Sequence, residues 1–205
     1  MSIGSLGEGS LKERFRETAR LAILDAAERV FAAQGFDGAR VDDIAAAAGV
    51  SVGTLYNYFG DRQQLLIALL DRRRQEVVAR LDEVLREGQD GPFPQLIEHF
   101  VRAFLGHFDD HRPLFQLAME EETSHLRGAT RRKSVIHDIV RRAERLVHLG
   151  VGKGVLRADD AAQFSAFLVG TMRGAAVRAK LERRLEPLEQ LAPTVVRFFL
   201  TGAQR

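Results

Sequence analysis

The sequence predicts an all-α fold of about nine helices, with a small N-terminal three-helix domain followed by a larger C-terminal helical bundle. Apolar residues recur every three or four positions along much of the 205-residue chain, which is the period of an amphipathic helix. No segment shows the sustained apolar/polar alternation of a strand, and no hairpin dipeptide separates β-rich runs. Breaks that contain glycine or proline divide the chain into separate helices.

Composition excludes several classes of protein. The chain is 45% hydrophobic and 28% charged, as is usual for a globular protein. It contains no cysteine, so neither a disulfide scaffold nor a cysteine-ligated zinc site is expected. No apolar run reaches the ~18 residues of a membrane span, and the N-terminal "MSIGSLGEGS" lacks the features of a signal peptide. We therefore expect a cytoplasmic protein with no membrane partner.

The first two helices follow from their start and stop signals. Residues 1–10 are typical of a flexible lead-in, and Ser10 begins the possible capping box "SLKE" of a first helix. This helix is expected to end at Gly35. A short second helix is expected at about 41–48, with its end at Gly49.

Two further helices begin at capping residues. Ser51 can cap a short third helix that extends to about Tyr58. Asp61, with Gln64 three residues later, can cap a fourth helix that continues to about Glu87. This long helix connects the three-helix domain to the rest of the chain.

The stretch "EGQDGPFP", residues 87–94, is the clearest boundary, because it combines two glycines with two prolines. Beyond it we predict helices at about 94–109, 112–125, 127–149, 159–184 and 187–202, and the last should start late or bend because it contains Pro193. The expected organisation is a flexible N-terminus (1–10), a domain of three helices (11–60), a linking helix (61–87) and a larger helical domain (88–205).

Two short helices joined by "AAGVS" form a helix-turn-helix. Gly49 permits the left-handed backbone of the tight turn, and Ile44, Val50 and Leu55 supply a small shared core. Arg62, in the first turn of the next helix, is placed to bind a flanking phosphate. The remaining face carries small, hydroxyl and amide groups that can contact phosphates and base edges, namely Ser51, Val52, Gly53, Thr54, Tyr56, Asn57 and Tyr58. The alternative is that the aromatic residues here belong to the core, which we expect in part for Phe59 and for one tyrosine ring.

Residues 16–66 resemble the DNA-binding domain of the TetR/AcrR family of transcriptional regulators. The matching segments are "ILDAAERVFAAQGFDG" and "VDDIAAAAGVSVGTLYNYFGDRQQLL", which ends in the specific pattern Y-x-Y-F-x-x-R-x-x-L. The resemblance implies that the residues just named on the third helix and its cap contact DNA, and that Arg62 replaces a phosphate-binding lysine. It also implies a symmetric dimer with a helical C-terminal domain.

One position departs from the family pattern. Where the family often has a threonine or serine that caps the second helix and touches a phosphate, this chain has Arg40. An arginine can reach a phosphate, so Arg40 is a candidate DNA contact, but it cannot cap the helix. Asp42 and Asp43 would repel DNA if they faced it, and residues 1–87 carry a net charge of −2. The prediction of DNA binding therefore depends on local pattern rather than on bulk charge.

Two C-terminal helices are candidates for a dimer interface. The stretch "AAQFSAFLVGTM", residues 161–172, carries no charge, so its helix is expected to be buried on every side, partly by a partner. Two glycines four residues apart favour close helix approach there, with local packing as the alternative. The predicted interface residues are Gly170, Gly174, Val195, Phe198 and Phe199. A two-fold dimer can bind both half-sites of a palindromic operator.

Aromatic and other apolar residues of the C-terminal domain could line a pocket for an unidentified, mostly apolar effector. Each of them taken singly is expected to be ordinary core. The proposed lining is Phe100, Phe104, His107, Phe108, Phe115, Leu117, Met119, Glu121, His125, Phe164, Phe167 and Met172.

His107 and His111 are four residues apart and could bind a metal on one continuous helix. The sequence "DDHRP" around the second histidine is typical of a helix end, which favours a solvated turn, so neither a metal nor a cofactor is expected. The basic runs at 72–74, 131–133 and 183–184 are expected to be solvated faces.

These features favour a dimeric repressor that a small molecule releases from a palindromic operator. An enzyme is disfavoured, and no catalytic residue is expected, because the chain has no Gly-rich phosphate loop, metal-ligand set or Ser-His-Asp spacing. The remaining alternative is a helical interaction module, or an activator without ligand-released repression. The expected partners are double-stranded DNA, a second copy of the chain and the effector.

Overall fold

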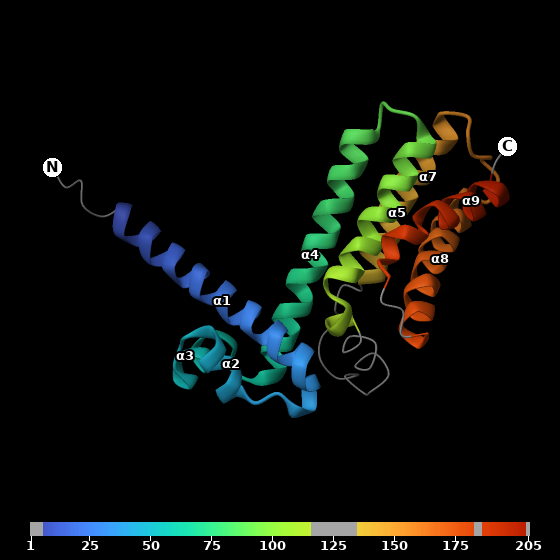
Figure 1. The fold of residues 1–205 in the computed structure, drawn as a ribbon. Helices are drawn as coiled ribbons and strands as arrows, with labels where there is room; N and C mark the ends of the chain where they lie inside the picture. The colour runs from blue at the N-terminus through green and yellow to red at the C-terminus, as the bar shows by residue number, and fades with distance from the viewer. Residues whose placement is uncertain (1–5, 116–134, 183–185, 204–205) are drawn as a thin grey trace. The chain divides into compact units, whose positions relative to one another are not determined.

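The computed structural model describes residues 6–115, 135–182 and 186–203 (Figure 1). In these ranges the chain forms α-helices and one 3-10 helix but no β-strand, so the prediction of an all-α fold is confirmed. The helices belong to two compact units, which divide α4 (Arg62–Gly88) between Arg73 and Arg74. None of the described helices combines the length and the apolarity needed to cross a membrane.

The N-terminal unit contains α1 (Leu6–Gly38), α2 (Val41–Ala48), α3 (Val52–Phe59) and the first part of α4. Helix α1 begins at Leu6 and already includes Ser10, so the prediction that Ser10 caps it is wrong. Gly35 interrupts α1 with φ 71° and ψ 173°, which is a conformation that favours glycine. The predicted stop at Gly35 is therefore a kink, and the helical segment continues to Gly38.

Local caps fix the ends of the short helices. Gly49 has left-handed backbone angles, φ 70° and ψ 28°, and its N–H donates to the last carbonyls of α2. The Oγ of Ser51 accepts from the Thr54 N–H at 3.1 Å, and the Oδ1 of Asp61 accepts from the Gln64 N–H at 2.7 Å. The predicted turn at Gly49 and the predicted caps at Ser51 and Asp61 are confirmed.

A compact apolar core holds α2 and α3 against α1 and α4. Ile44 and Leu55 are both 0% exposed, which confirms that the helix-turn-helix shares a core. Phe15, near the start of α1, is 68% exposed, so the buried face of this helix begins further along the chain. The residues of α1 and α4 that complete the core include Ile23, Leu24, Ala26, Ala27, Phe31, Leu65, Leu66 and Leu69.

The C-terminal unit contains the rest of α4, α5 (Phe93–Asp110), α7 (Val135–Gly152), α8 (Ala161–Leu181), η1 (Leu188–Leu191) and α9 (Ala192–Ala203). The predicted helices at 94–109 and 159–184 correspond to α5 and α8. The last helix starts late, as expected: the 3-10 helix η1 comes first, and Pro193 lies in the first turn of α9, where its missing N–H breaks no helical bond. The predicted helix at 112–125 lies mostly outside the described residues.

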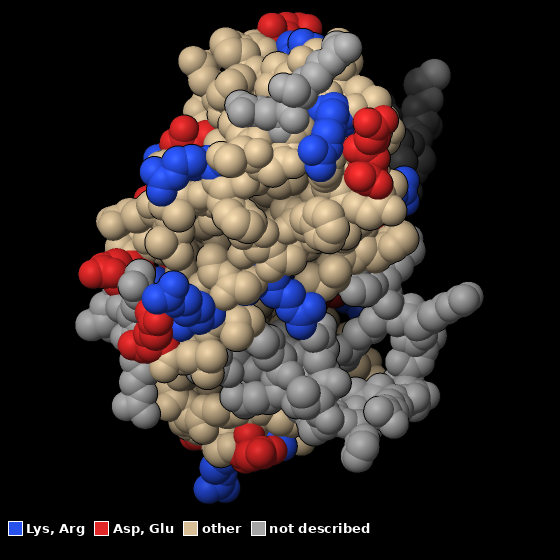
Figure 2. All heavy atoms as spheres, turned by 90° about the vertical axis from the view of Figure 1, so that its right-hand side faces the viewer, with Lys and Arg blue, Asp and Glu red and all other residues tan. Residues whose placement is uncertain are grey.

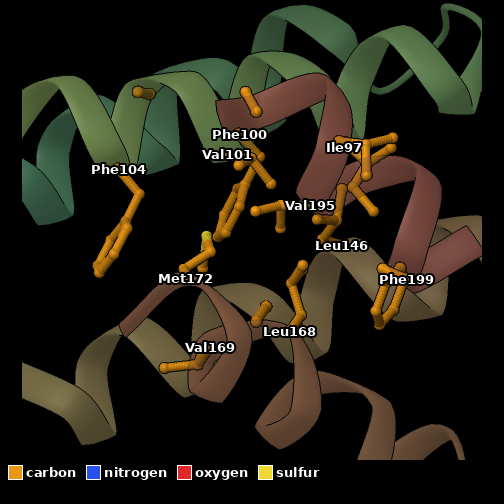
Figure 3. Packing of buried hydrophobic residues seen from close by; sticks show 14 of the residues in the cluster. Ile97, Phe100, Val101, Phe104, Leu146, Leu168, Val169, Met172, Val195 and Phe199 are labelled. Carbon is orange, nitrogen blue, oxygen red and sulfur yellow. The ribbon is translucent and has the colours of Figure 1, made fainter. Parts of the chain in front are cut away.

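The core of the C-terminal unit lies between α5, α7, α8 and α9. Figure 3 shows Phe100 and Phe104 projecting from α5 toward the side of Met172, and all three are at most 1% exposed. The helix α7 approaches this core closely, because a β-carbon on Gly150 would lie only 2.6 Å from Cζ of Phe93. Glycine therefore lets α7 pack directly on the start of α5.

Three consecutive arginines of α4 form ion pairs with other helices rather than the predicted solvated face. Their side chains are 24% exposed or less. The first two bind carboxylates of α1 within the N-terminal unit, and the third binds α7 within the C-terminal unit. The basic runs at 131–133 and 183–184 lie outside the described residues. The pairs are Arg72–Asp25 (2.7 Å), Arg73–Glu28 and Arg74–Asp138 (2.6 Å).

One face of α8 and α9 is exposed and apolar, so the expectation that α8 is buried on every side does not hold within a single chain. Phe167 and Phe198 are 61% and 71% exposed. Figure 2 looks onto the side of the molecule that carries these helices in Figure 1, and it shows a broad area without charged side chains. Val195 and Phe199, predicted to face a partner, instead lie in the core of their own chain, 4% and 6% exposed. The residues Val195 and Phe199 are one helical turn apart and share a face, from which Phe198 is rotated by about 100°.

Candidate nucleic-acid interface

The helix α3 has one buried face and one exposed face. Leu55 and Phe59 anchor it in the core, at 0% and 7% exposed, whereas the Tyr56 ring is 45% exposed. Tyr58 is half-buried against the same core, as expected for one of the two tyrosines. The side chains left exposed or half-exposed are those predicted to contact DNA: Ser51, Val52, Gly53, Thr54, Tyr56, Asn57 and Tyr58. The structure thus gathers them on one short helix and its cap.

The N-terminus of α3 presents ordered hydroxyl groups. The Oγ of Ser51 and the Oγ1 of Thr54 lie 2.8 Å apart, and the Ser51 oxygen also accepts the Thr54 backbone N–H. The remaining N–H groups of the first turn and the helix dipole favour a negative charge at this end. The site therefore has the chemistry of a phosphate contact beside an exposed amide, Asn57, one turn along the helix.

Arg62 contacts the chain itself in this structure. Its Nη1 donates to the carbonyl oxygens of Ala39 at 2.9 Å and Asp37 at 3.3 Å. Its guanidinium also lies over the Phe36 ring, 4.4 Å from the centroid. Arg62 therefore fastens the start of α4 to the connection between α1 and α2, a role that local sequence did not reveal because its partners are more than 20 residues away. The predicted phosphate contact stays a prediction.

The start of α2 matches the expectation for Arg40. This residue is the N-cap, and its side chain makes no capping hydrogen bond. Asp42 and Asp43 occupy the first turn, where carboxylates interact favourably with the helix dipole. Gln34 Nε2 donates to Asp43 Oδ2 at 3.3 Å, which holds that carboxylate toward α1. The two aspartates thus have a structural role in stabilising α2.

The residues predicted to line an effector pocket do not all lie together. Phe167 lies on the exposed face of α8 rather than in the interior, and Phe115 belongs to the N-terminal unit. Phe108 is half-buried against the C-terminal core. Four members lie outside the described residues: Leu117, Met119, Glu121 and His125. Those buried in the C-terminal unit are Phe100, Phe104, His107, Phe164 and Met172.

Comparisons with known proteins agree with this architecture. Residues 23–69, from the middle of α1 into α4, match the model of the bacterial regulatory proteins of the tetR family. The chain is 26% identical to the HTH-type transcriptional repressor DhaR of Mycobacterium sp. (strain GP1), over 92% of this chain and 96% of DhaR. It is 36% identical to the fatty acid metabolism regulator protein of Bacillus subtilis (strain 168) over 67 residues, which are 33% of this chain and 34% of that protein.

Solved structures show the same fold over nearly the whole chain. The transcriptional regulator FadR from Bacillus subtilis, in complex with stearoyl-CoA, aligns with a TM-score of 0.72 and 19% identity, covering 90% of this chain and 99% of FadR. The motif, the helix-turn-helix geometry and the relatives thus point to a transcriptional regulator and not to an enzyme. Residues 23–69 thus match the tetR family of bacterial regulatory proteins, and the repressor DhaR aligns with nearly the whole chain.

Proposed function

We propose that this protein is a dimeric repressor, which leaves a palindromic operator when a mostly apolar small molecule binds its C-terminal domain. The observation that carries the proposal is the exposed polar face of α3, held on a buried helix-turn-helix core within the matched range 23–69. A protein that acts on bacterial DNA works in the cytoplasm. In this scheme residues 11–60 bind DNA and residues 88–205 bind the effector and a partner. Residues 61–87 form the helix that links these two domains.

Specific DNA contacts are assigned by chemistry. Tyr56, Arg62 and Arg40 can position the domain on phosphates, whereas Thr54, Asn57 and Tyr58 are nearer to base edges. Asn57 is the best candidate for base readout, because an exposed amide can pair in a bidentate way with adenine. The Thr54 hydroxyl already lies 2.8 Å from the Ser51 hydroxyl, so its loss would also disturb the cap.

The exposed face of α8 and α9 supports dimerisation. Two aromatic side chains stand out from the surface there, and burying them against a partner removes apolar area from water. A β-carbon on Gly170 or Gly174 would meet no described side chain or neighbouring backbone within 4 Å, so packing within the chain does not account for these glycines. A partner helix that approaches closely does account for them, because each glycine in a helix costs ~1 kcal/mol relative to alanine.

An apolar effector is supported by the composition of the C-terminal core and by the relatives. Phe100, Phe104 and Phe164 from α5 and α8 lie in one buried cluster with Met172. DhaR is a repressor, and the structure of Bacillus subtilis FadR holds stearoyl-CoA. A long acyl chain is therefore a reasonable first probe. The helix α4 starts at the DNA-binding domain and ends in the C-terminal unit, so it is the candidate link between effector and DNA.

The decisive experiment is a selection of bound fragments from a random DNA pool with the purified protein. We expect a palindrome whose half-site centres lie about one helical turn apart, ~34–36 Å. Binding to it should weaken steeply as salt rises. Absence of any enriched sequence, together with salt-independent and weak DNA binding, would contradict the proposal and favour a helical interaction module.

A further inference from the structure

The end of α5 brings two histidines together. His107 lies in the last turn of α5, and His111 is the residue at its C-cap, with φ −129° and ψ 28°. The helix therefore ends where the sequence predicted, but the ring centroids are only 4.8 Å apart. His107 is 5% exposed, so the prediction of a solvated turn is wrong for this residue. A helix end does not separate side chains that are one turn apart.

A carboxylate from α4 completes the group. Oε2 of Glu76 lies 3.9 Å from Nε2 of His111. One ligand atom from each of the three residues lies within 4.8 Å of the others. All three residues belong to the C-terminal unit. No local sequence pattern could reveal the group, because Glu76 is 31 residues before His107 and meets it only through the packing of α4 on α5.

We propose that Glu76, His107 and His111 bind a divalent transition-metal ion, with Zn²⁺ as the favoured cation. Two imidazole nitrogens and one carboxylate oxygen are donors that Zn²⁺ accepts in proteins, whereas Mg²⁺ and Ca²⁺ prefer oxygen alone. Three protein ligands leave one tetrahedral position for water or another small ligand.

The distances require only a modest adjustment. Tetrahedral zinc with bonds of about 2.1 Å holds its ligands about 3.4 Å apart. The Glu76–His111 pair must therefore close by about 0.5 Å, and the most distant donors by up to about 1.4 Å. The Glu76 side chain is 38% exposed and has several rotatable bonds, so it can move while the buried His107 stays fixed.

The local charges do not oppose a cation. Three arginines near the group in sequence each pair with a carboxylate: Arg80 with Asp110 (3.9 Å), Arg112 with Asp109 (2.6 Å) and Arg73 with Glu28. Two buried or half-buried imidazoles and a carboxylate give a site with one formal negative charge when the histidines are neutral. The bound ion would fasten α4 to the C-terminal end of α5, beside the Arg80–Asp110 ion pair, and so stabilise the C-terminal unit.

The test uses the full chain without a histidine tag, freed of metal with a chelator that is then removed. Calorimetry with Zn²⁺ should show one ion per chain, and Co²⁺ should give visible absorption from its nitrogen and oxygen ligands. His111→Gln and Glu76→Gln remove half-buried ligands and should each weaken Zn²⁺ binding by at least about 100-fold, since even outer-shell changes cost 10–100-fold. The matched control is His99→Gln, an exposed histidine on the same helix, which should bind like the wild type.

Thermal unfolding gives a second readout that needs neither DNA nor effector. Saturating Zn²⁺ should raise Tm in the wild type and in His99→Gln, but not in Glu76→Gln. The proposal is overturned if the wild type binds no Zn²⁺, if binding survives unchanged in His111→Gln and Glu76→Gln, or if Mg²⁺ binds as tightly as Zn²⁺. Because the variants remain measurable for DNA binding, failure of this site is distinct from failure of the proposed repressor function.

Discussion

Replacing Arg62 by alanine tests whether this residue fastens the DNA-binding domain together. The change removes a 2.9 Å hydrogen bond to the carbonyl of the buried Ala39, a longer one to Asp37, and the contact of the guanidinium with the Phe36 ring. A hydrogen bond to a charged group contributes ~1.5–3 kcal/mol, and an exposed cation–π contact adds ~0.5–1 kcal/mol. We therefore expect the free energy of unfolding of the N-terminal unit to fall by ~2–4 kcal/mol.

The chain provides a natural probe for this measurement. It has no tryptophan, and both of its tyrosines, Tyr56 and Tyr58, lie on α3. Tyrosine fluorescence in urea therefore reports the unfolding of the N-terminal unit alone. With a slope of ~1–3 kcal/mol per molar urea, Arg62→Ala should lower the midpoint by about 1 M or more. Arg40→Ala is the matched control, because Arg40 is exposed and makes no capping bond, and it should change stability by less than ~0.5 kcal/mol.

Measurements of DNA binding distinguish the stabilising role of Arg62 from a direct contact with a phosphate. If Arg62 also binds a phosphate, Arg62→Ala weakens binding to all DNA sequences alike. It also reduces the slope of log affinity against log salt concentration by about one. Arg62→Lys keeps the positive charge but loses the several N–H donors of the guanidinium. This variant should therefore be less stable, while its DNA binding keeps most of its salt dependence. An unchanged urea midpoint in Arg62→Ala would show that the hydrogen bonds are absent in solution. Altered base preference with an intact salt slope would show that the assignment of DNA-contact roles is wrong.

Three further outcomes are expected. Asn57→Ala should change preference at one base pair by ~1–3 kcal/mol in a binding assay over operator variants, and a uniform loss at every position would instead mark Asn57 as a phosphate contact. Gly170→Leu should weaken the dimer by ~1–3 kcal/mol, measured by sedimentation, because the added side chain overpacks against the partner. Gly152→Leu, at an exposed site with equally open space, should leave the dimer unchanged. A wild-type protein that is monomeric at micromolar concentration would refute the interface. Stearoyl-CoA, if it is an inducer, should bind 5–150-fold more weakly in calorimetry when operator is present, because linkage is reciprocal, and equal affinity in both titrations would exclude it as one.

The sequence alone determined the features that depend on neighbours in the chain. The cap at Ser51, the cap at Asp61 and the left-handed turn at Gly49 each need only a side chain or a backbone conformation within four residues. Helical periodicity placed most helices and the burial of Ile44 and Leu55 for the same reason. These local signals also carry the family motif, which is why the helix-turn-helix and its exposed face could be predicted.

Only the tertiary structure decided which distant side chains meet. Arg62 finds its carbonyl partners more than 20 residues away, and the basic run at 72–74 is ion-paired because α1 and α7 bring carboxylates to it. On α9, composition alone could not tell the buried Phe199 from the exposed Phe198, since that choice depends on which face meets α5 and α8. The group of Glu76, His107 and His111 has the same origin, because the packing of α4 on α5 sets its geometry and no spacing in the sequence encodes it.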